Sequence, residues 1–209
     1  MTAESAEALS SLRSADHFEW YTVNLIAFVV YIYARAVQRK EWEKVTLALG
    51  FWAVEFLWEM LNALILRFSG HAPLWIVGKK SVLLIYVGLN LEIALMFGVL
   101  PLVLLDLLPA DRTARIWRVP NRLFVPVVLG LFCVGVEILL WRWGALVWTW
   151  WWWKLPHVWL IAISYCGPLA ALVWIHDHVS ARRKFQGMLV AMAAAAAAHL
   201  LLVHGLRWI

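Results

Sequence analysis

Four glutamates, Glu55, Glu59, Glu92 and Glu137, lie in stretches that are otherwise apolar enough to form membrane-spanning helices. An ionised side chain near the centre of a bilayer costs about 2.5–3.5 kcal/mol or more. One such residue is tolerable by chance, whereas four in 209 residues indicate a polar interior with a role. We therefore take these carboxyl groups as the candidate functional site.

The spacing of the polar residues indicates that they meet. Glu55, Glu59 and Asn62 share one face of a helix, because four and then three residues separate them. The catalytic candidates are Glu59, Glu55 and Glu92. The candidate substrate-binding residues lie at similar depth in the other apolar stretches or beside them: Asn62, Asn90, Glu137, Trp148, Trp151, His157, Tyr165 and His199. The alternatives are snorkelling to the interface for Glu137, interfacial positions for the histidines, and packing hydrogen bonds for the asparagines.

Carboxyl groups in such surroundings are suited to acid chemistry. A low dielectric disfavours the charged form of an acid, and two acids on one helical turn resist joint ionisation. A protonated glutamate is then a general acid for an olefin or an epoxide. The same groups would also serve proton-coupled transport. The motifs H-E-x-x-H, E-x-x-H and C-x-x-C are absent, so we predict no metal site and no cofactor.

Composition identifies the class of protein that positions these side chains. The chain is 64% hydrophobic and 15% charged, with a mean hydropathy of +0.77, whereas soluble domains carry about 25% charged residues. We predict an all-α, polytopic membrane helix bundle. The net charge of +5 does not require a nucleic-acid partner, because most basic residues cluster in loops. Residues 1–19 are a polar N-terminal segment without a signal-peptide pattern, and residues 20–209 form one transmembrane domain.

Six apolar windows approach the length needed to cross about 30 Å of hydrocarbon. They are Trp20–Ala36, Val45–Leu66, Ser81–Leu107, Leu123–Trp141, His157–Ile175 and Phe185–His204. The loops after the first, third and fifth windows hold 11 of the 18 Lys and Arg residues. The positive-inside rule places these loops in the cytoplasm. It places both termini outside the cytoplasm, together with Lys79 and Lys80. We expect a multi-pass protein of a bacterial cytoplasmic membrane.

Tryptophan is concentrated in one segment. Of 16 Trp residues, seven lie in Trp141–Trp153, which is more than an interfacial belt needs. The part Trp143–Trp153 is too short to span a membrane, and we interpret it as interfacial or re-entrant, with a seventh span as the alternative. In the predicted orientation this segment lies over the carboxyl groups. Its indole faces, those of Trp148 and Trp151 among them, would suit an apolar ligand or a cation.

Residues Trp20–Gly98 resemble the opening of the integral-membrane meroterpenoid cyclases of fungi and their bacterial relatives. The resemblance depends on Leu57-Trp58-Glu59 in the second window and on Gly88-Leu89-Asn90-Leu91 in the third. In that family a Trp-Glu pair carries a catalytic acid, so the resemblance implies this role for Glu59. Those cyclases have seven spans with a second acid on the last, where this chain has His199.

These observations favour a membrane protein that binds a lipophilic, isoprenoid-like substrate and applies acid chemistry to it, as a proton-initiated terpene cyclase does. The alternatives are a proton- or cation-coupled small transporter and a non-catalytic lipid- or pigment-binding subunit of a membrane complex. The expected partners are membrane lipid and a lipophilic small molecule. Assembly as a homo-oligomer or within a larger membrane complex is left open.

Overall fold

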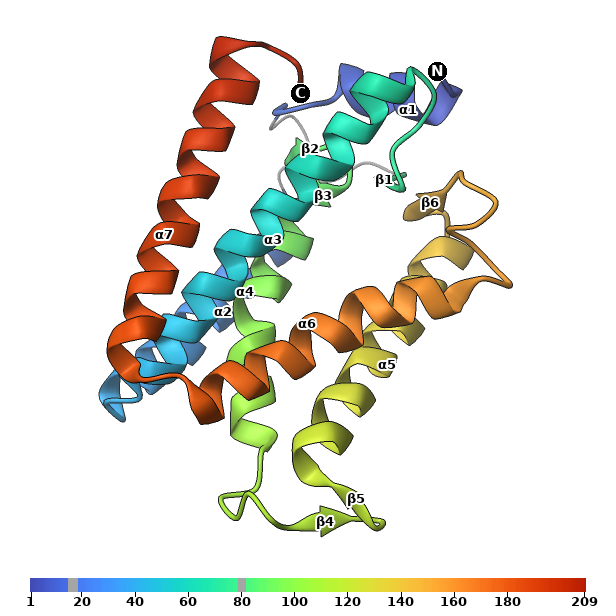
Figure 1. Ribbon diagram of the computed structural model, residues 1–209. Coiled ribbons are helices and arrows are strands. Elements are labelled where there is room, and N and C mark those ends of the chain that lie inside the picture. Colours follow the sequence, from blue (N-terminus) through green and yellow to red (C-terminus); the bar gives the residue numbers. More distant parts are fainter. Residues whose placement is uncertain (15–18, 79–81) are drawn as a thin grey trace.

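The computed structural model describes residues 1–14, 19–78 and 82–209, which form a predominantly helical molecule (Figure 1). Five of its helices are long and apolar enough to cross a membrane. They are α2 (Trp20–Gln38), α3 (Trp42–Ser69), α5 (Asn121–Arg142), α6 (Val158–His178) and α7 (Ala181–His199), which continues as the π-helical turn η1 (Leu200–Gly205). The prediction of an all-α bundle of apolar helices is confirmed.

The third predicted window is not one continuous helix. Its helical part, α4 (Leu91–Leu107), is about 26 Å long at about 1.5 Å per residue, slightly short of the hydrocarbon thickness. The residues before it form an antiparallel hairpin of β2 (Leu84–Tyr86) and β3 (Leu89–Asn90), and the expected start at Ser81 lies outside the described residues. The helix begins late because the side chain of Asn90 caps it, accepting a hydrogen bond from the Ile93 amide at 2.8 Å.

The tryptophan-rich segment is not a spanning helix, so the alternative of a seventh span is wrong. After α5, Gly144 adopts a positive φ of 68°, a conformation that glycine reaches without strain, and the chain reverses. Strand β6 (Leu146–Trp148) then pairs antiparallel with β1 (Trp75–Val77). The indole of Trp150 donates to the Ala72 carbonyl at 3.1 Å. Pairing with the loop after α3 therefore satisfies backbone groups that a spanning helix would have paired internally.

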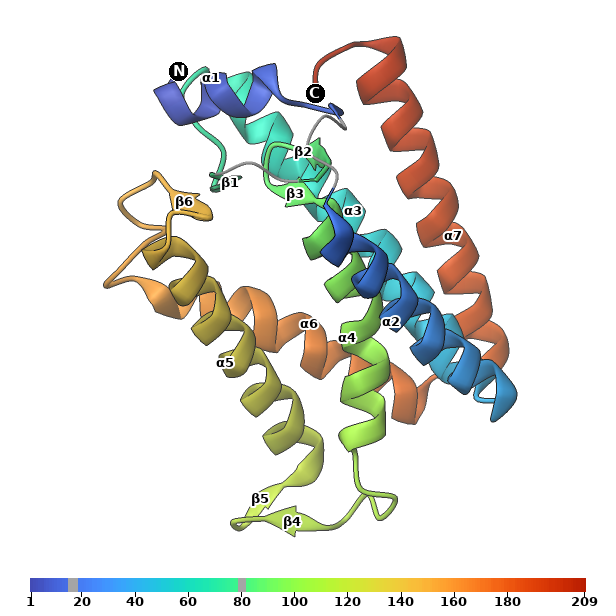
Figure 2. The ribbon, with the colours of Figure 1, turned by 180° about the vertical axis from the view of Figure 1, so that it is seen from behind.

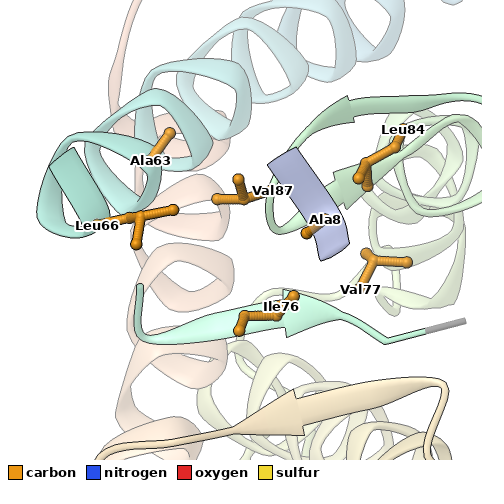
Figure 3. Packing of buried hydrophobic residues seen from close by; sticks show 7 residues of the cluster. All are labelled: Ala8, Ala63, Leu66, Ile76, Val77, Leu84 and Val87. Atoms are coloured by element: carbon orange, nitrogen blue, oxygen red, sulfur yellow. The ribbon is translucent and has the colours of Figure 1, made fainter. Parts of the chain in front are cut away.

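The N-terminal segment adds a short helix to the core. Helix α1 (Ala3–Ser10) begins after Thr2, whose side chain accepts a hydrogen bond from the Ser5 amide at 3.2 Å. It lies across the end of the bundle, beside the C-terminal end of α3 (Figure 2). The buried cluster beneath it joins α1, α3, β1 and the hairpin (Figure 3) and consists of Ala8, Ala63, Leu66, Ile76, Val77, Leu84 and Val87.

Both termini lie at one end of the molecule, and the basic loops lie at the other (Figures 1 and 2). These loops are the α2–α3 connection, the connection with the hairpin of β4 (Arg115–Ile116) and β5 (Val119–Pro120), and the α6–α7 connection. This arrangement agrees with the alternation of spans expected from the sequence. Which end faces the cytoplasm stays a prediction, and Lys79 and Lys80 lie outside the described residues.

The helices pack as two groups. Helix α3 packs closely against α7 and α4, with α2 against α4, whereas α5 packs along α6. Gly130 permits the close approach of α5 to α6, because a Cβ atom there would lie only 2.6 Å from the Sγ atom of Cys166. Few contacts join α5 and α6 to α3 and α4, and a cavity occupies the space between these groups.

Candidate functional site

A cavity of about 1270 Å³ lies between α3, α4, α5, α6 and α7. Ligand pockets commonly measure about 300–1,000 Å³, so this one has room for a long molecule. Its wall is mostly apolar and includes Phe51, Val54 and Phe132. Along α3 the lining residues run from Thr46 to Leu61, a distance of about 22 Å at about 1.5 Å per residue.

All four glutamates line this one cavity. Glu55 and Glu59 come from α3, Glu92 from the first turn of α4, and Glu137 from the C-terminal half of α5. Of the other candidate residues, Asn90 and Tyr165 line it as well. Side chains that are distant in the sequence thus share one apolar chamber, and their roles in it stay predictions.

Glu59 is enclosed by the protein, with 3% of its surface exposed. The indole Nε1 of Trp75 donates to both of its carboxylate oxygens, at 3.2 Å each. Glu55, one turn earlier on α3, and Glu137 are close enough to interact with Glu59 electrostatically. The shared indole N–H fixes the position of the Glu59 carboxyl group, and repulsion between like charges disfavours ionisation of Glu59 and its neighbours at the same time.

Asn62 does not line the cavity but holds the loop that carries Trp75. Its side chain donates to the Trp75 carbonyl at 2.9 Å and accepts from the Leu74 amide at 2.7 Å. Gly88 leaves room for this arrangement, because a Cβ atom there would lie 2.5 Å from Nε1 of Trp75 and 2.4 Å from Nδ2 of Asn62. The structure therefore makes Asn62 a positioning residue, in line with the packing alternative.

Three tryptophans, Trp58, Trp75 and Trp153, line the cavity beside the acids. Trp75 stacks with both of the others, with ring centroids 6.4 Å from Trp58 and 5.7 Å from Trp153 and interplanar angles of 30°. The two tryptophans expected from the sequence lie elsewhere: Trp148 is buried outside the cavity wall, and Trp151 is 68% exposed. The turn after β6 directs Trp153 toward the acids instead, and neither helical nor strand periodicity describes a turn.

Glu137 is buried rather than directed to the interface, with 9% of its surface exposed. Its Oε2 atom is fully enclosed and has no hydrogen-bond partner among the described residues. Tyr165 of α6 interacts electrostatically with Glu137, Glu55 and Glu59, and its ring stacks on Phe97 with centroids 6.2 Å apart. An enclosed carboxyl oxygen without a partner is costly as an anion, so the neutral acid is the favoured form of Glu137.

Glu92 lies apart from the other three acids at the edge of the cavity. Its Oε1 atom accepts a hydrogen bond from the hydroxyl of Tyr21 at 2.5 Å and one from the Val82 amide at 3.4 Å. These bonds tie the first turn of α4 to α2 and to the hairpin. Asn90, which also lines the cavity, uses its side-chain oxygen to cap α4.

The two histidines expected at the site do not line the cavity. His157 precedes α6, where its Nδ1 atom lies 3.2 Å from the Trp151 carbonyl. His199 lies on the other side of α3, where its Nδ1 atom is 2.6 Å from the Tyr86 hydroxyl. Burial raises the pKa of Tyr86, which lies outside the spanning helices, to about 12. The hydrogen bond between the Tyr86 hydroxyl and Nδ1 of His199 joins β2 to the end of α7.

The chemistry available in the cavity is that of acids and aromatic rings. Among the described residues, no group of three or more His, Cys, Asp or Glu side chains is arranged to hold a metal ion. The wall instead combines the enclosed carboxyl group of Glu137, the carboxyl group of Glu59 with its hydrogen bond from Trp75, and three tryptophan rings. Trp75 was not found from the sequence, because it lies in strand β1 outside the helices. Trp153 belongs to the tryptophan-rich segment expected over the acids but was not singled out within it.

Comparison with known proteins places the chain among membrane proteins of unknown role. A family model described as an uncharacterized membrane protein family matches residues 2–205. An uncharacterized protein of Archaeoglobus fulgidus is 38% identical over 178 residues, which cover 84% of this chain and 84% of that protein. No solved structure matches the chain. The resemblance to meroterpenoid cyclases is wrong, because the family that matches nearly the whole chain is not a terpene cyclase family and the similarity depended on two short apolar motifs.

Proposed function

The chain belongs to this uncharacterized family of membrane proteins, and we propose that it binds a long isoprenoid-like lipid in its central cavity and protonates it there. One observation carries the proposal: carboxyl groups from α3 and α5 meet in a single apolar cavity of about 1270 Å³. An apolar wall favours a hydrocarbon chain over a polar solute. Polar side chains inside it then act on a defined part of that chain.

Glu137 and Glu59 have different roles in this proposal. Glu137 is the proton donor, because it lines the cavity and its carboxyl group has no donor among the described residues that would stabilise the anion at Oε2. Glu59 is the proton acceptor of the pair, because the Trp75 indole donates to both of its oxygens and so stabilises a charge on Glu59 relative to one on Glu137, which has no such donor among the described residues. Two enclosed acids that resist joint ionisation can share one proton, and a pair in which one acid donates and the other accepts is a common arrangement for acid and base catalysis.

The simplest reaction for this pair is the isomerisation of a carbon–carbon double bond. The O–H bond of Glu137 breaks, and its proton forms a C–H bond with the π electrons of the olefin, which leaves a carbocation. Glu59 then removes a proton from a neighbouring carbon, and the electrons of that C–H bond form the new double bond. The net result is a shifted double bond, with one proton moved from Glu137 to Glu59. No oxidant, reductant or cofactor is needed.

The three lining tryptophans support a cationic intermediate. A cation within about 6 Å of an indole face is stabilised, by about 2 kcal/mol or more where water is excluded. Trp58, Trp75 and Trp153 stack beside the acids, which also gives the site a water-poor wall. The carboxylate of Glu59 adds electrostatic stabilisation to the same charge.

Deuterium transfer to the lipid tests the proposal. The protein would be purified into nanodiscs, and its co-purifying lipids would be identified by mass spectrometry. The protein would then be incubated in D2O with these lipids and with a panel of isoprenoid olefins. Wild-type protein is expected to add deuterium to carbon. Glu137→Gln should reduce the rate about 100-fold or more, because general acid catalysis contributes about 10²–10⁴. Glu7→Gln, an exposed glutamate of α1, is the matched control and should leave the rate unchanged.

Two results would contradict the proposal. Deuterium incorporation by Glu137→Gln at the wild-type rate would remove this residue from the chemistry. Binding of the lipid by wild-type protein with no incorporation from any member of the panel would refute the acid chemistry and leave a lipid-binding protein.

Proton-coupled transport is a second candidate, favoured by the length of the cavity. Its lining runs from Trp75 and Trp153, near the end that holds the termini, to Arg183 and Lys184, near the opposite end. Substrate-dependent acidification of proteoliposomes that is lost in Glu55→Gln would support transport over a reaction at carbon.

A further inference from the structure

The cavity has a basic end as well as an acidic one. Arg183 and Lys184, in the first turn of α7, line it at the end of the molecule where the basic loops gather. Lys184 is 5% exposed and is already engaged, since its Nζ atom pairs with Glu43 and donates to the His176 carbonyl at 2.6 Å. Arg183 has neither an ion pair nor a hydrogen bond to any of the described residues.

Three other cations at this end, Arg122, Arg112 and Lys44, have ion-pair partners within the protein. Arg122 lies 2.7 Å and Arg112 lies 3.4 Å from the carboxylate of Asp177, and Lys44 pairs with Asp106. Arg182 is exposed like Arg183 and has no ion pair among the described residues, but it does not line the cavity. Among the described residues, Arg183 is therefore an exposed cation at this end that lines the cavity and has no ion pair.

The N-terminus of α7 adds to the positive potential at this point. Ser180 precedes the helix, but its side chain makes no capping hydrogen bond, and the first turn has no acidic residue. The first amide groups of a helix point outward without intrahelical partners and attract anions. Val179 and Arg183, which flank this N-terminus, both line the cavity.

We propose that the cavity binds a single-chain, isoprenoid-like lipid with a terminal phosphate, which lies against Arg183 and the N-terminus of α7. The acids repel an anion at the other end, and a phosphate within the apolar wall between them would be unpaired and costly. The head therefore lies at the basic end, and the chain runs along α3 for about 22 Å toward Glu59 and Glu137.

This assignment rests on the proposed function in one respect, the choice of the reacting atoms. It makes the end of the chain farthest from the phosphate the part that Glu137 protonates. Binding of the phosphate and the direction of the chain rest on the geometry alone, so the two proposals can fail separately.

The test uses a saturated, long-chain alkyl phosphate with a diazirine at the end of its chain, bound to the intact protein in nanodiscs. A probe with the same chain and a trimethylammonium head is the second arm. We expect the phosphate probe to bind more tightly and, after irradiation, to label residues 136–140 of α5 or Trp75 and Trp153. Arg183→Gln should weaken binding of the phosphate probe about tenfold or more, because it removes a charge-assisted hydrogen bond.

Matched variants make the result specific. Arg182→Gln removes the same charge from the neighbouring position and should leave the affinity for the phosphate probe within about twofold, because Arg182 does not line the cavity and an exposed charge without a direct contact is screened by salt. Arg183→Lys keeps a point charge and should lose less affinity than Arg183→Gln. None of the three arginine variants should change the affinity for the trimethylammonium probe. Arg182 and Arg183 are both exposed, so we expect these substitutions to leave the fold intact.

Three outcomes would overturn this inference. Equal loss of affinity in Arg183→Gln and Arg182→Gln would show that Arg183 does not hold the head. Labelling near Val179 by the chain-end diazirine would reverse the direction of the chain. Displacement of the probe by phosphatidic acid at matched concentration would assign the cavity to a two-chain phospholipid. Glu137→Gln should bind the saturated probe as wild type does, so a failure of the acid chemistry leaves this result unaffected.

Discussion

The hydrogen bond from Trp75 to Glu59 offers a direct measurement of how the cavity is held together. Trp75→Phe removes the indole N–H but keeps an aromatic ring at the same place between Trp58 and Trp153. Trp148 is the matched control. It lies opposite Trp75 in the β1–β6 pair, is equally buried, and its Nε1 atom has no hydrogen-bond partner among the described residues.

The magnitude follows from the difference between the two indoles. Both substitutions remove a similar area of buried ring, so this loss cancels when the variants are compared. Trp75→Phe also removes the N–H donor and leaves the enclosed carboxyl group of Glu59 without it, a loss of about 1.5–3 kcal/mol. Trp148→Phe removes a buried N–H group that already lacks a partner. The free energy of unfolding of Trp75→Phe should therefore be lower than that of Trp148→Phe by about 1.5–3 kcal/mol.

Thermal unfolding in detergent checks this difference. For a chain of this size, 1 kcal/mol corresponds to about 2–4 °C in Tm, so the two variants should differ by about 3–12 °C. The double variant Trp75→Phe with Glu59→Gln completes a mutant cycle, and we expect a coupling of about 1 kcal/mol or more between the two positions. Equal Tm values for Trp75→Phe and Trp148→Phe would refute the idea that this hydrogen bond holds Glu59 in place.

Two further predictions concern packing and loop position. Gly130→Ala should lower Tm, because its Cβ atom would lie 2.6 Å from the Sγ atom of Cys166 in α6, and overpacking costs about 1–3 kcal/mol. Gly135→Ala on the same helix meets no atom within 4 Å and should raise Tm, because alanine has a higher helix propensity by up to about 1 kcal/mol. A fall in Tm for both variants would contradict the described crossing of α5 and α6. Asn62→Ala should cost more than Asn90→Ala in thermal unfolding, because Asn62 satisfies two buried backbone groups at about 1–3 kcal/mol each, while Asn90 supplies one helix cap worth about 1 kcal/mol. Equal costs would show that Asn62 does not hold the loop before β1.

Local patterns in the sequence predicted the elements that depend on neighbouring residues. Apolar runs predicted the long helices within a few residues at most ends, because hydrocarbon thickness sets a minimum length for each run. The four-residue spacing of Glu55 and Glu59 predicted a shared helical face, because helical periodicity is a local property. The late start of α4 was missed. Asn90 sets the first residue of the helix through one side-chain hydrogen bond, and a mean hydropathy over a window of residues does not detect such a cap.

Only the tertiary structure decided which polar groups meet and in what state. The enclosed position of Glu137 depends on the packing of α5 against its neighbours, and the hydrogen bonds of Glu59 depend on a strand pair between β1 and β6, about 70 residues apart. His157 and His199 lie outside the cavity wall. The sequence by itself determined that acids lie in apolar helices at comparable depth. Which of them share a chamber was decided by helix rotation and non-local pairing, because a one-dimensional pattern sets the depth of a residue but not the neighbour that it faces.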